Sequence, residues 1–163
     1  MDMDDIQMIQ PDRPPYHVVD PEGAAEMQWF ALQDAMITDI CTPLLAPDVP
    51  ATPSRILDLA CGAGIWAMRV AKTYPQVQIT GIDINPSIVD YAQLTAEGEC
   101  ITNVIFQHAD YTQLDQTFSP AQFDFVNARL ILWNIGPKKR ELVRHWGTVC
   151  LLYTSPSPRD RQK

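Results

Sequence analysis

The glycine-containing turn within residues 58–67, DLACGAGIWA, is the feature that most limits what this chain can fold into. An apolar segment leads into the turn, and Gly62 and Gly64 stand at its centre. Glycine lets the backbone bend sharply and lets a ligand approach with no Cβ in the way. From Ile65 the pattern becomes helical, and the first N–H groups of a helix can receive a negatively charged group. The stretch therefore predicts a strand, a tight turn and a helix in direct succession.

Strands and helices alternate along the rest of the chain. The predicted strands are residues 55–60 and 77–83, with two more opening at 104–106 and 123–126, and the predicted helices are residues 65–74, 86–98 and 137–150. Strands separated by helices favour a parallel sheet with helices on both faces. We therefore predict an α/β fold with a doubly wound parallel sheet, preceded by an N-terminal helical segment.

The N-terminal third has a different character. Residues 1–50 hold ten acids and one base, so they carry most of the formal net charge of −8. Residues 1–19 are predicted to be a disordered acidic arm, because three prolines block regular structure. Residues 20–54 are predicted as a helix and a proline-rich linker. One apolar face of that helix, expected to pack on the core or to bind a partner or cover a substrate, consists of Ala25, Trp29, Leu32, Met36 and Ile40.

Composition argues against several classes of function. An acidic chain is a poor candidate for broad binding to a phosphate backbone. No apolar run approaches the ~20 residues that span a bilayer, and the acidic N-terminus does not resemble a secretory signal. We therefore expect a soluble protein of the cytoplasm, with the nucleus as the alternative. The four cysteines and three histidines share no ligand spacing, so no metal site is expected.

The acid at Asp58 bears on which nucleotide the glycine turn would bind. Gly62-x-Gly64-x-x-Ala67 also fits the dinucleotide fingerprint, but dinucleotide folds usually keep that strand end apolar. The segment ILDLACGAGIWA resembles the first motif of class I S-adenosylmethionine-dependent methyltransferases, especially the fungal enzymes of secondary metabolism. Three later segments resemble further motifs of that family in order: ITGIDINPSIVDYAQ, VIFQHADYTQL and FDFVNARLIL. The resemblance implies a Rossmann-like sheet, as a partial class I methyltransferase fold, over residues 55–150.

The resemblance also implies a set of cofactor-binding residues. The residues implied at the methionine and sulfonium end are Asp58, Ala60, Cys61, Gly62, Gly64, Asn127 and Arg129. The residues implied at the adenosine end are Asp83, Ile84, Asp110 and Tyr111. Among the acids, Asp58 would hold the ammonium group, Asp83 would accept from both ribose hydroxyls, and Asp110 would accept from the adenine amino group. The alternatives are a surface turn for Asp110, ordinary packing for Tyr111 and pairing with a nearby acid for Arg129.

The chemistry that the resemblance implies makes modest demands on the protein. An activated methyl group needs alignment with its acceptor, and a base is needed only when the acceptor must lose a proton. His108 and His145 are candidates, but no pairing supports either, so the catalytic residues stay unassigned.

The C-terminal end departs from the family pattern. Where a turn and a fifth strand are expected, residues 151–163 read LLYTSPSPRDRQK, a disordered composition. We interpret this segment as a non-native tail, with a natural flexible tail as the alternative. The chain would then be C-terminally truncated, with an incomplete core and a fourth strand whose open edge invites aggregation.

Three functions follow as hypotheses. The first is S-adenosylmethionine-dependent methyl transfer to a small molecule or natural product, without direct nucleic-acid or membrane binding. The second is a non-catalytic S-adenosylmethionine-binding regulatory protein that contacts a protein partner through its acidic N-terminal segment. The third is a nicotinamide-dependent oxidoreductase. The sequence identifies neither the methyl acceptor nor the oligomeric state.

Overall fold

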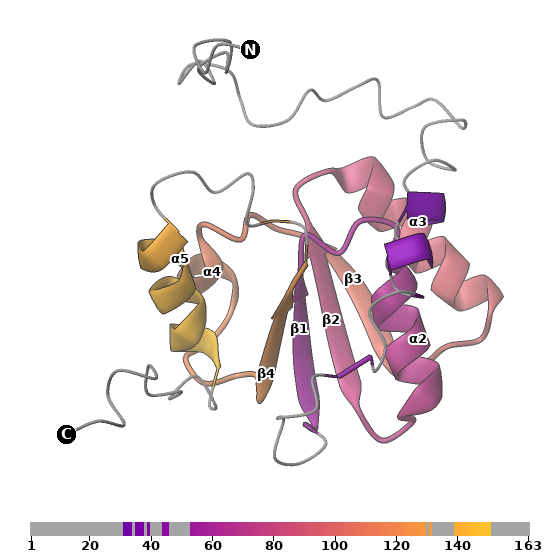
Figure 1. The fold of residues 1–163 in the computed structure, drawn as a ribbon, viewed down its shortest axis with the longest axis horizontal. Helices are drawn as coiled ribbons and strands as arrows, with labels where there is room; N and C mark the ends of the chain where they lie inside the picture. The colour runs from indigo at the N-terminus through magenta and orange to yellow at the C-terminus, as the bar shows by residue number, and fades with distance from the viewer. Residues whose placement is uncertain are drawn as a thin grey trace, which may run out of the picture.

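The structure is a computed structural model that describes residues 31–33, 35–37, 39, 44–45, 53–129, 131 and 139–150. Its elements are β1 (Arg55–Leu59), α2 (Ile65–Thr73), β2 (Gln78–Asp83), α3 (Pro86–Gly98), β3 (Val104–His108), α4 (Leu114–Thr117), β4 (Phe125–Ala128), α5 (Lys139–Trp146) and the 3₁₀ turn η3 (Gly147–Val149). The strands form one sheet in the order β3-β2-β1-β4 (Figure 1). Every neighbouring pair is parallel. The predicted α/β fold with a parallel sheet is confirmed.

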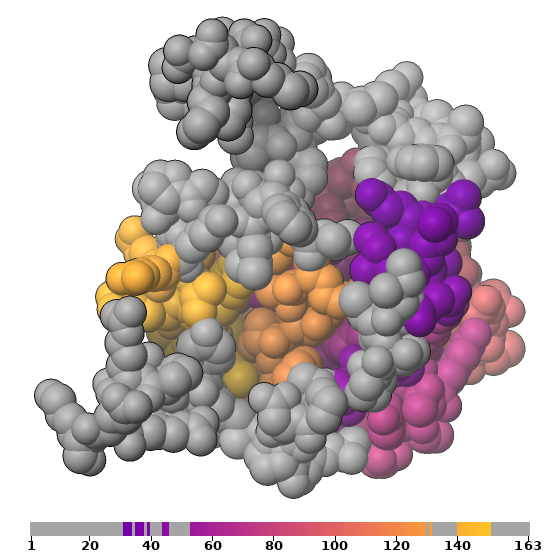
Figure 2. Space-filling model, in the orientation of Figure 1, coloured from indigo at the N-terminus to yellow at the C-terminus, as the bar shows by residue number. Residues whose placement is uncertain are grey.

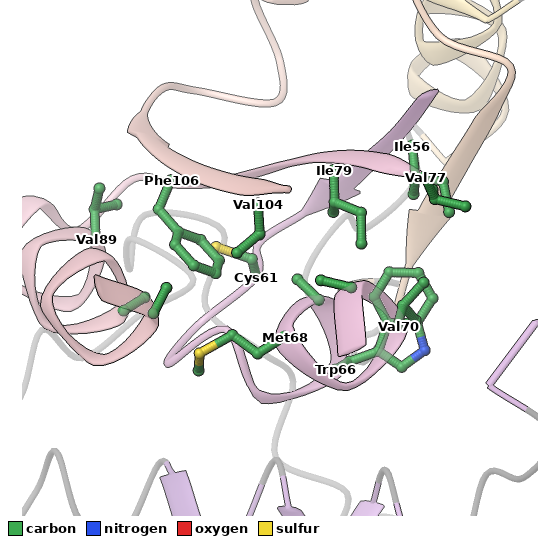
Figure 3. Close-up of a cluster of buried hydrophobic side chains, with 14 of the residues drawn as sticks. Ile56, Cys61, Trp66, Met68, Val70, Val77, Ile79, Val89, Val104 and Phe106 are labelled. Carbon is green, nitrogen blue, oxygen red and sulfur yellow. The ribbon is translucent and has the colours of Figure 1, made fainter. Parts of the chain in front are cut away.

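Helices cover both faces of this sheet, as a doubly wound fold requires (Figure 1). Because successive strand residues face opposite sides, Ile56 packs in the cluster under α2 and α3, whereas Leu57 packs in the cluster with α4 and α5. Figure 3 shows the first cluster, in which Trp66 and Val70 of α2 lie against the sheet. The core is therefore split into two apolar layers by the sheet.

Most predicted elements are confirmed, with small differences at their ends. Asn85 begins α3 as predicted, because its side-chain oxygen accepts the N–H of Ser87 at 3.0 Å. The sequence did not predict α4, since a single helical turn is too short to show a period. The helix predicted to run to residue 150 ends at Trp146, because Gly147 opens the 3₁₀ turn.

The N-terminal helix differs from the prediction in which side it buries. Residues 31–33, 35–37 and 39 are helical and lie at the surface beside α2 (Figure 2). Leu32 and Met36 are 54% and 57% exposed, so their expected packing on the core is wrong. The helix instead approaches α2 through an ion pair between Asp39 and Arg69. The period predicted that the two apolar residues share a face, but it did not determine which face is covered. Ala25, Trp29 and Ile40, the other residues of that face, lie outside the described residues.

Two amide side chains fasten the sheet to its helices. The Nδ2 of Asn103 donates to the carbonyl oxygens of Ala71, Tyr74 and Val77 at 3.0, 3.4 and 2.9 Å, which ties the end of α2 to the starts of β2 and β3. The Oε1 of Gln93, on α3, accepts the N–H of Phe106 at 3.0 Å. These bonds hold the β2–β3 half of the sheet, which carries two of the predicted site loops.

Candidate functional site

The predicted site residues gather where the parallel strands end. The loops after β1, β2 and β3 open on the carboxyl edge of the sheet, where β4 also ends at Ala128 (Figure 1). The order of the strands reverses between β1 and β4, because the chain runs outward to β3 and then returns to the other side of β1. In open α/β sheets, ligands bind in the crevice at such a reversal.

The loop after β1 has a left-handed backbone at three positions. Ala60, Gly62 and Gly64 have φ angles of 51°, 55° and 77°. The N–H of Cys61 donates to the carbonyl of Ile82 at 2.9 Å, which anchors the loop on β2. Among the described residues no side chain caps α2, which begins after Gly64. The start of α2 therefore lies directly at the loop that follows β1.

The two loop glycines are required for different reasons. A Cβ built at Gly62 would meet no described atom within 4 Å, so this position borders open space. A Cβ at Gly64 would lie 2.4 Å from the Cζ of Phe106, and one at Gly81 on β2 would lie 2.6 Å from its Cδ1. The ring of Phe106 thus packs directly on two glycine backbones. In Figure 3 the ring points toward Cys61, whose side chain is buried in the same cluster.

Asp83 ends β2 and is bound to the glycine loop. Its Oδ2 accepts the N–H of Gly62 at 3.1 Å, and its Oδ1 accepts the N–H of Asn85 at 3.0 Å. Burial raises the pKa of this carboxyl above the ordinary 3.8, although these backbone hydrogen bonds and the nearby His108 act in the opposite direction. A carboxylate has about four acceptor positions, so Asp83 can accept further hydrogen bonds from a ligand.

Asp58 and Asn127 face each other across the reversal of strand order. They are register partners on β1 and β4, and the Nδ2 of Asn127 donates to the Oδ1 of Asp58 at 2.6 Å. Asp58 is only 3% exposed. Two residues further along the chain, the guanidinium carbon of Arg129 lies 5.4 Å from the ring centroid of Trp66 on α2. The structure thus brings the predicted β1 and β4 residues to one place.

Asp110 and Tyr111 lie on the loop after β3. The Oδ1 of Asp110 accepts both the N–H and the hydroxyl of Thr112 at 2.8 Å, so the acid closes a turn and keeps Oδ2 for another partner. The ring of Tyr111 packs edge-on against Trp146 with centroids 5.9 Å apart, and its carbonyl accepts the Trp146 indole N–H at 3.0 Å. Tyr111 therefore takes part in packing between this loop and α5.

Neither described candidate for a base lies at the β1–β4 crevice. The Nε2 of His145 accepts the N–H of Leu114 at 3.2 Å. Asp115 lies 3.6 Å from the same nitrogen, but an ion pair would need a proton there. The Nε2 of His108 lies 3.0 Å from the carbonyl oxygen of Ile84. Sequence reasoning missed this last contact, which depends on the pairing of β2 with β3.

The described residues contain neither a metal site nor a membrane-spanning helix. Within that part of the chain, no group of three or more histidine, cysteine or acidic side chains could hold a metal ion. No helix there is both long and apolar enough to cross a bilayer.

Comparison with known proteins identifies the family. A family model described as a methyltransferase domain matches residues 56–150, which is more than half of the chain. The chain belongs to the class I, S-adenosylmethionine-dependent methyltransferases. The cofactor of this family is S-adenosylmethionine, so the matched segment is a methyltransferase domain rather than a nicotinamide-dependent one.

Two curated relatives and one solved structure illustrate the match. Methyltransferase str2 of Strobilurus tenacellus is 32% identical over 115 residues, which are 69% of this chain and 38% of the relative. Ribosomal RNA small subunit methyltransferase G of Streptococcus suis is 34% identical over 96 residues, which are 57% of this chain and 40% of the relative. A SAM-dependent methyltransferase from Aquifex aeolicus is 16% identical with a TM-score of 0.53, covering 60% of this chain and 50% of that one, and so supports the fold. The chain spans about two fifths of the length of these curated relatives.

Proposed function

We propose that this chain binds S-adenosylmethionine at the carboxyl edge of its sheet and transfers the methyl group to a small-molecule acceptor. The single observation that carries the cofactor site is the position of Gly62. Its left-handed φ and the absence of described atoms around a built Cβ leave a backbone cradle that a side chain would fill. A methyltransferase domain needs such a cradle beside the start of a helix.

The methionine end of the cofactor would lie over β1 and β4. Gly62 and Gly64, with the backbone of Ala60 and Cys61, would border it. The carboxylate of Asp58 would attract the ammonium group, directly or through water. The buried hydrogen bond from Asn127 supports this role, because it fixes the orientation of the Asp58 carboxylate at the β1–β4 crevice. Asn127 and Arg129 would lie beside the sulfonium.

The adenosine end would lie over β2 and β3. The remaining acceptor positions of Asp83 suit the two hydroxyls of a ribose. Hydrogen bonds from these hydroxyls would also stabilise the ionised form of the carboxyl, which burial disfavours. Ile84 is 54% exposed, and its apolar side chain would pack on the adenine ring. The Oδ2 of Asp110 would accept from the adenine amino group, with Tyr111 holding the loop.

The reaction itself would depend on alignment. The bound cofactor would supply an activated methyl group for in-line transfer to the acceptor atom, with the methyl–sulfur bond breaking and S-adenosylhomocysteine as the leaving group. Since neither His108 nor His145 lies at the β1–β4 crevice, we propose no base from the described residues. An acceptor that is already deprotonated or is a neutral amine suits such a site.

A small-molecule acceptor is the finer part of the proposal. Residues 51–150 hold nine acids and eight bases, so this stretch carries no net positive charge that would favour a phosphate backbone. The resemblance of the glycine-loop motif to the methyltransferases of fungal secondary metabolism favours a natural product. Because some of the curated relatives are ribosomal RNA methyltransferases, RNA is the alternative acceptor class that the experiment must test.

Two measurements test the proposal in sequence. Calorimetric titration should show binding of S-adenosylhomocysteine and none of a nicotinamide dinucleotide, and binding of the dinucleotide alone would overturn the cofactor assignment. Transfer of a labelled methyl group should then appear in the small-molecule fraction of a cell extract. Label in the RNA fraction would overturn the acceptor class, and binding with transfer to neither fraction would favour a regulatory protein.

A further inference from the structure

His108 is the last residue of β3 and the register partner of Asp83 on β2. Its side chain reaches the backbone that follows Asp83, where its Nε2 lies 3.0 Å from the carbonyl oxygen of Ile84. A carbonyl oxygen can only accept a hydrogen bond, so the proton of this bond resides on Nε2. Both the Nε2–H neutral tautomer and the protonated ring carry that proton, so the bond survives either charge state.

The carbonyl of Ile84 and the N–H of Asn85 belong to one peptide group, which is planar and rotates as a unit. The N–H end of this peptide donates to the Oδ1 of Asp83 at 3.0 Å, and the carbonyl end accepts from His108. The peptide is therefore held at both ends. Hydrogen bonds in such a chain polarise and strengthen one another, and rotation of the peptide would break both of them together.

The other contacts of Asp83 are made with backbone outside this peptide. The Oδ2 of Asp83 is bound to the N–H of Gly62, and its own carbonyl accepts the N–H of Ala109 at 3.1 Å. Both partners belong to backbone that is anchored by the sheet or the glycine loop. Oδ1 is bound to the N–H of the Ile84–Asn85 peptide, which His108 holds at its carbonyl end, and the backbone of Ile84 also donates a hydrogen bond to this carboxyl.

We propose that His108 is a positioning residue, which acts through the Ile84–Asn85 peptide to orient the Asp83 carboxylate for the two ribose hydroxyls of the cofactor. The inference rests on the proposed binding of S-adenosylmethionine and adds a residue that would not touch the cofactor hydroxyls itself. A preorganised carboxylate loses less orientational freedom when the ribose binds. The side chain of His108 is exposed, so the fold does not depend on burying it.

The experiment compares two replacements of the same residue. His108→Leu keeps an apolar side chain of similar size and has no donor, whereas His108→Gln keeps an N–H donor at a similar reach. Calorimetric titration with S-adenosylhomocysteine should show affinity about three- to tenfold weaker for His108→Leu, as expected for loss of one hydrogen bond. His108→Gln should restore affinity to within roughly twofold of the wild type, and the thermal midpoints of both variants should match the wild type.

A second ligand separates positioning of Asp83 from any general loosening of the site. The 2′,3′-dideoxy analogue of S-adenosylhomocysteine has no hydroxyls for Asp83, so its affinity, measured by competition, should be the same in the wild type and in His108→Leu. The proposal is overturned if His108→Leu binds S-adenosylhomocysteine as tightly as the wild type, if His108→Gln is as weak as His108→Leu, or if the dideoxy analogue loses affinity equally. If the wild type binds no S-adenosylhomocysteine, the proposed cofactor is wrong and the role of His108 falls with it.

Discussion

Replacement of Gly62 by alanine should weaken cofactor binding by at least as much as it destabilises the fold. An alanine at a φ near +55° costs about 1–2 kcal/mol of strain, and the stiffer unfolded chain offsets roughly 0.4–1 kcal/mol of this. Because the new Cβ meets no described atom within 4 Å, no steric cost is added. We therefore expect a loss of about 1 kcal/mol of unfolding free energy, or roughly 4 °C in Tm.

The same Cβ would occupy the cradle proposed for the methionine part of the cofactor. Forcing a methyl group into a close-packed contact costs about 1–3 kcal/mol, so affinity for S-adenosylhomocysteine should fall by roughly tenfold or more. Urea unfolding followed by circular dichroism gives the stability, and calorimetric titration gives the affinity. The reasoning would be refuted by a Gly62→Ala protein that binds S-adenosylhomocysteine as tightly as the wild type.

Two further glycines provide matched controls. Gly64→Ala combines a φ of 77° with a Cβ only 2.4 Å from the ring of Phe106, so it should lower the unfolding free energy by roughly 2–5 kcal/mol. Gly98→Ala, at the end of α3, has open space around its Cβ and no left-handed φ, and should stabilise the protein by up to about 1 kcal/mol without changing affinity. Equal instability of Gly62→Ala and Gly64→Ala would show that the space at Gly62 is not open.

Three other predictions follow from the hydrogen bonds of the site and sheet. Burial raises the pKa of Asp83 above 3.8, and ribose hydroxyls bind the ionised carboxylate. Affinity for S-adenosylhomocysteine should therefore be full above the raised pKa and should decline as the pH falls, starting above pH 3.8. Calorimetric titrations at decreasing pH check this, and an affinity that stays constant down to pH 3.8 would contradict it. Asn127→Leu removes a donor from the buried Asp58 and should lower the unfolding free energy by about 1–3 kcal/mol while weakening S-adenosylhomocysteine binding. Asn103→Leu, which removes one donor from three carbonyl oxygens, should destabilise by about 2–3 kcal/mol in urea unfolding with unchanged affinity for S-adenosylhomocysteine in the folded protein; an equal loss of affinity would mean that the sheet ends are coupled to the site.

The fold was predictable wherever the physical cause is local. The short apolar segment around Asp58 favours a buried strand, the glycines favour a turn, and Asn85 followed by proline begins a helix by accepting the N–H of Ser87. The N-terminal helix was different. Its period correctly grouped Leu32 with Met36, yet the neighbour that covers a face is a property of the tertiary structure, and those two side chains are exposed.

The sequence nominates the residues of the proposed site, but it does not indicate the contacts between them. Strand ends on one edge of a parallel sheet bring acids such as Asp83 and Asp110 together, so motif and topology sufficed to nominate them. The hydrogen bond between Asn127 and Asp58 and the contact of His108 with the Ile84 carbonyl after the neighbouring β2 depend on the register of the strands. Register follows from how whole strands pack, and a single sequence carries no direct signal of it.

The packing of Phe106 on Gly64 and Gly81 has an evolutionary consequence. One ring in the interior touches both the loop that borders the proposed cofactor site and the strand that carries Asp83. These three positions should therefore change together, so that a homologue with alanine on the inner strand carries a smaller side chain in place of the phenylalanine. Cofactor affinity in such a lineage could then drift through a substitution in the core, with every ligand-contacting residue left as it was.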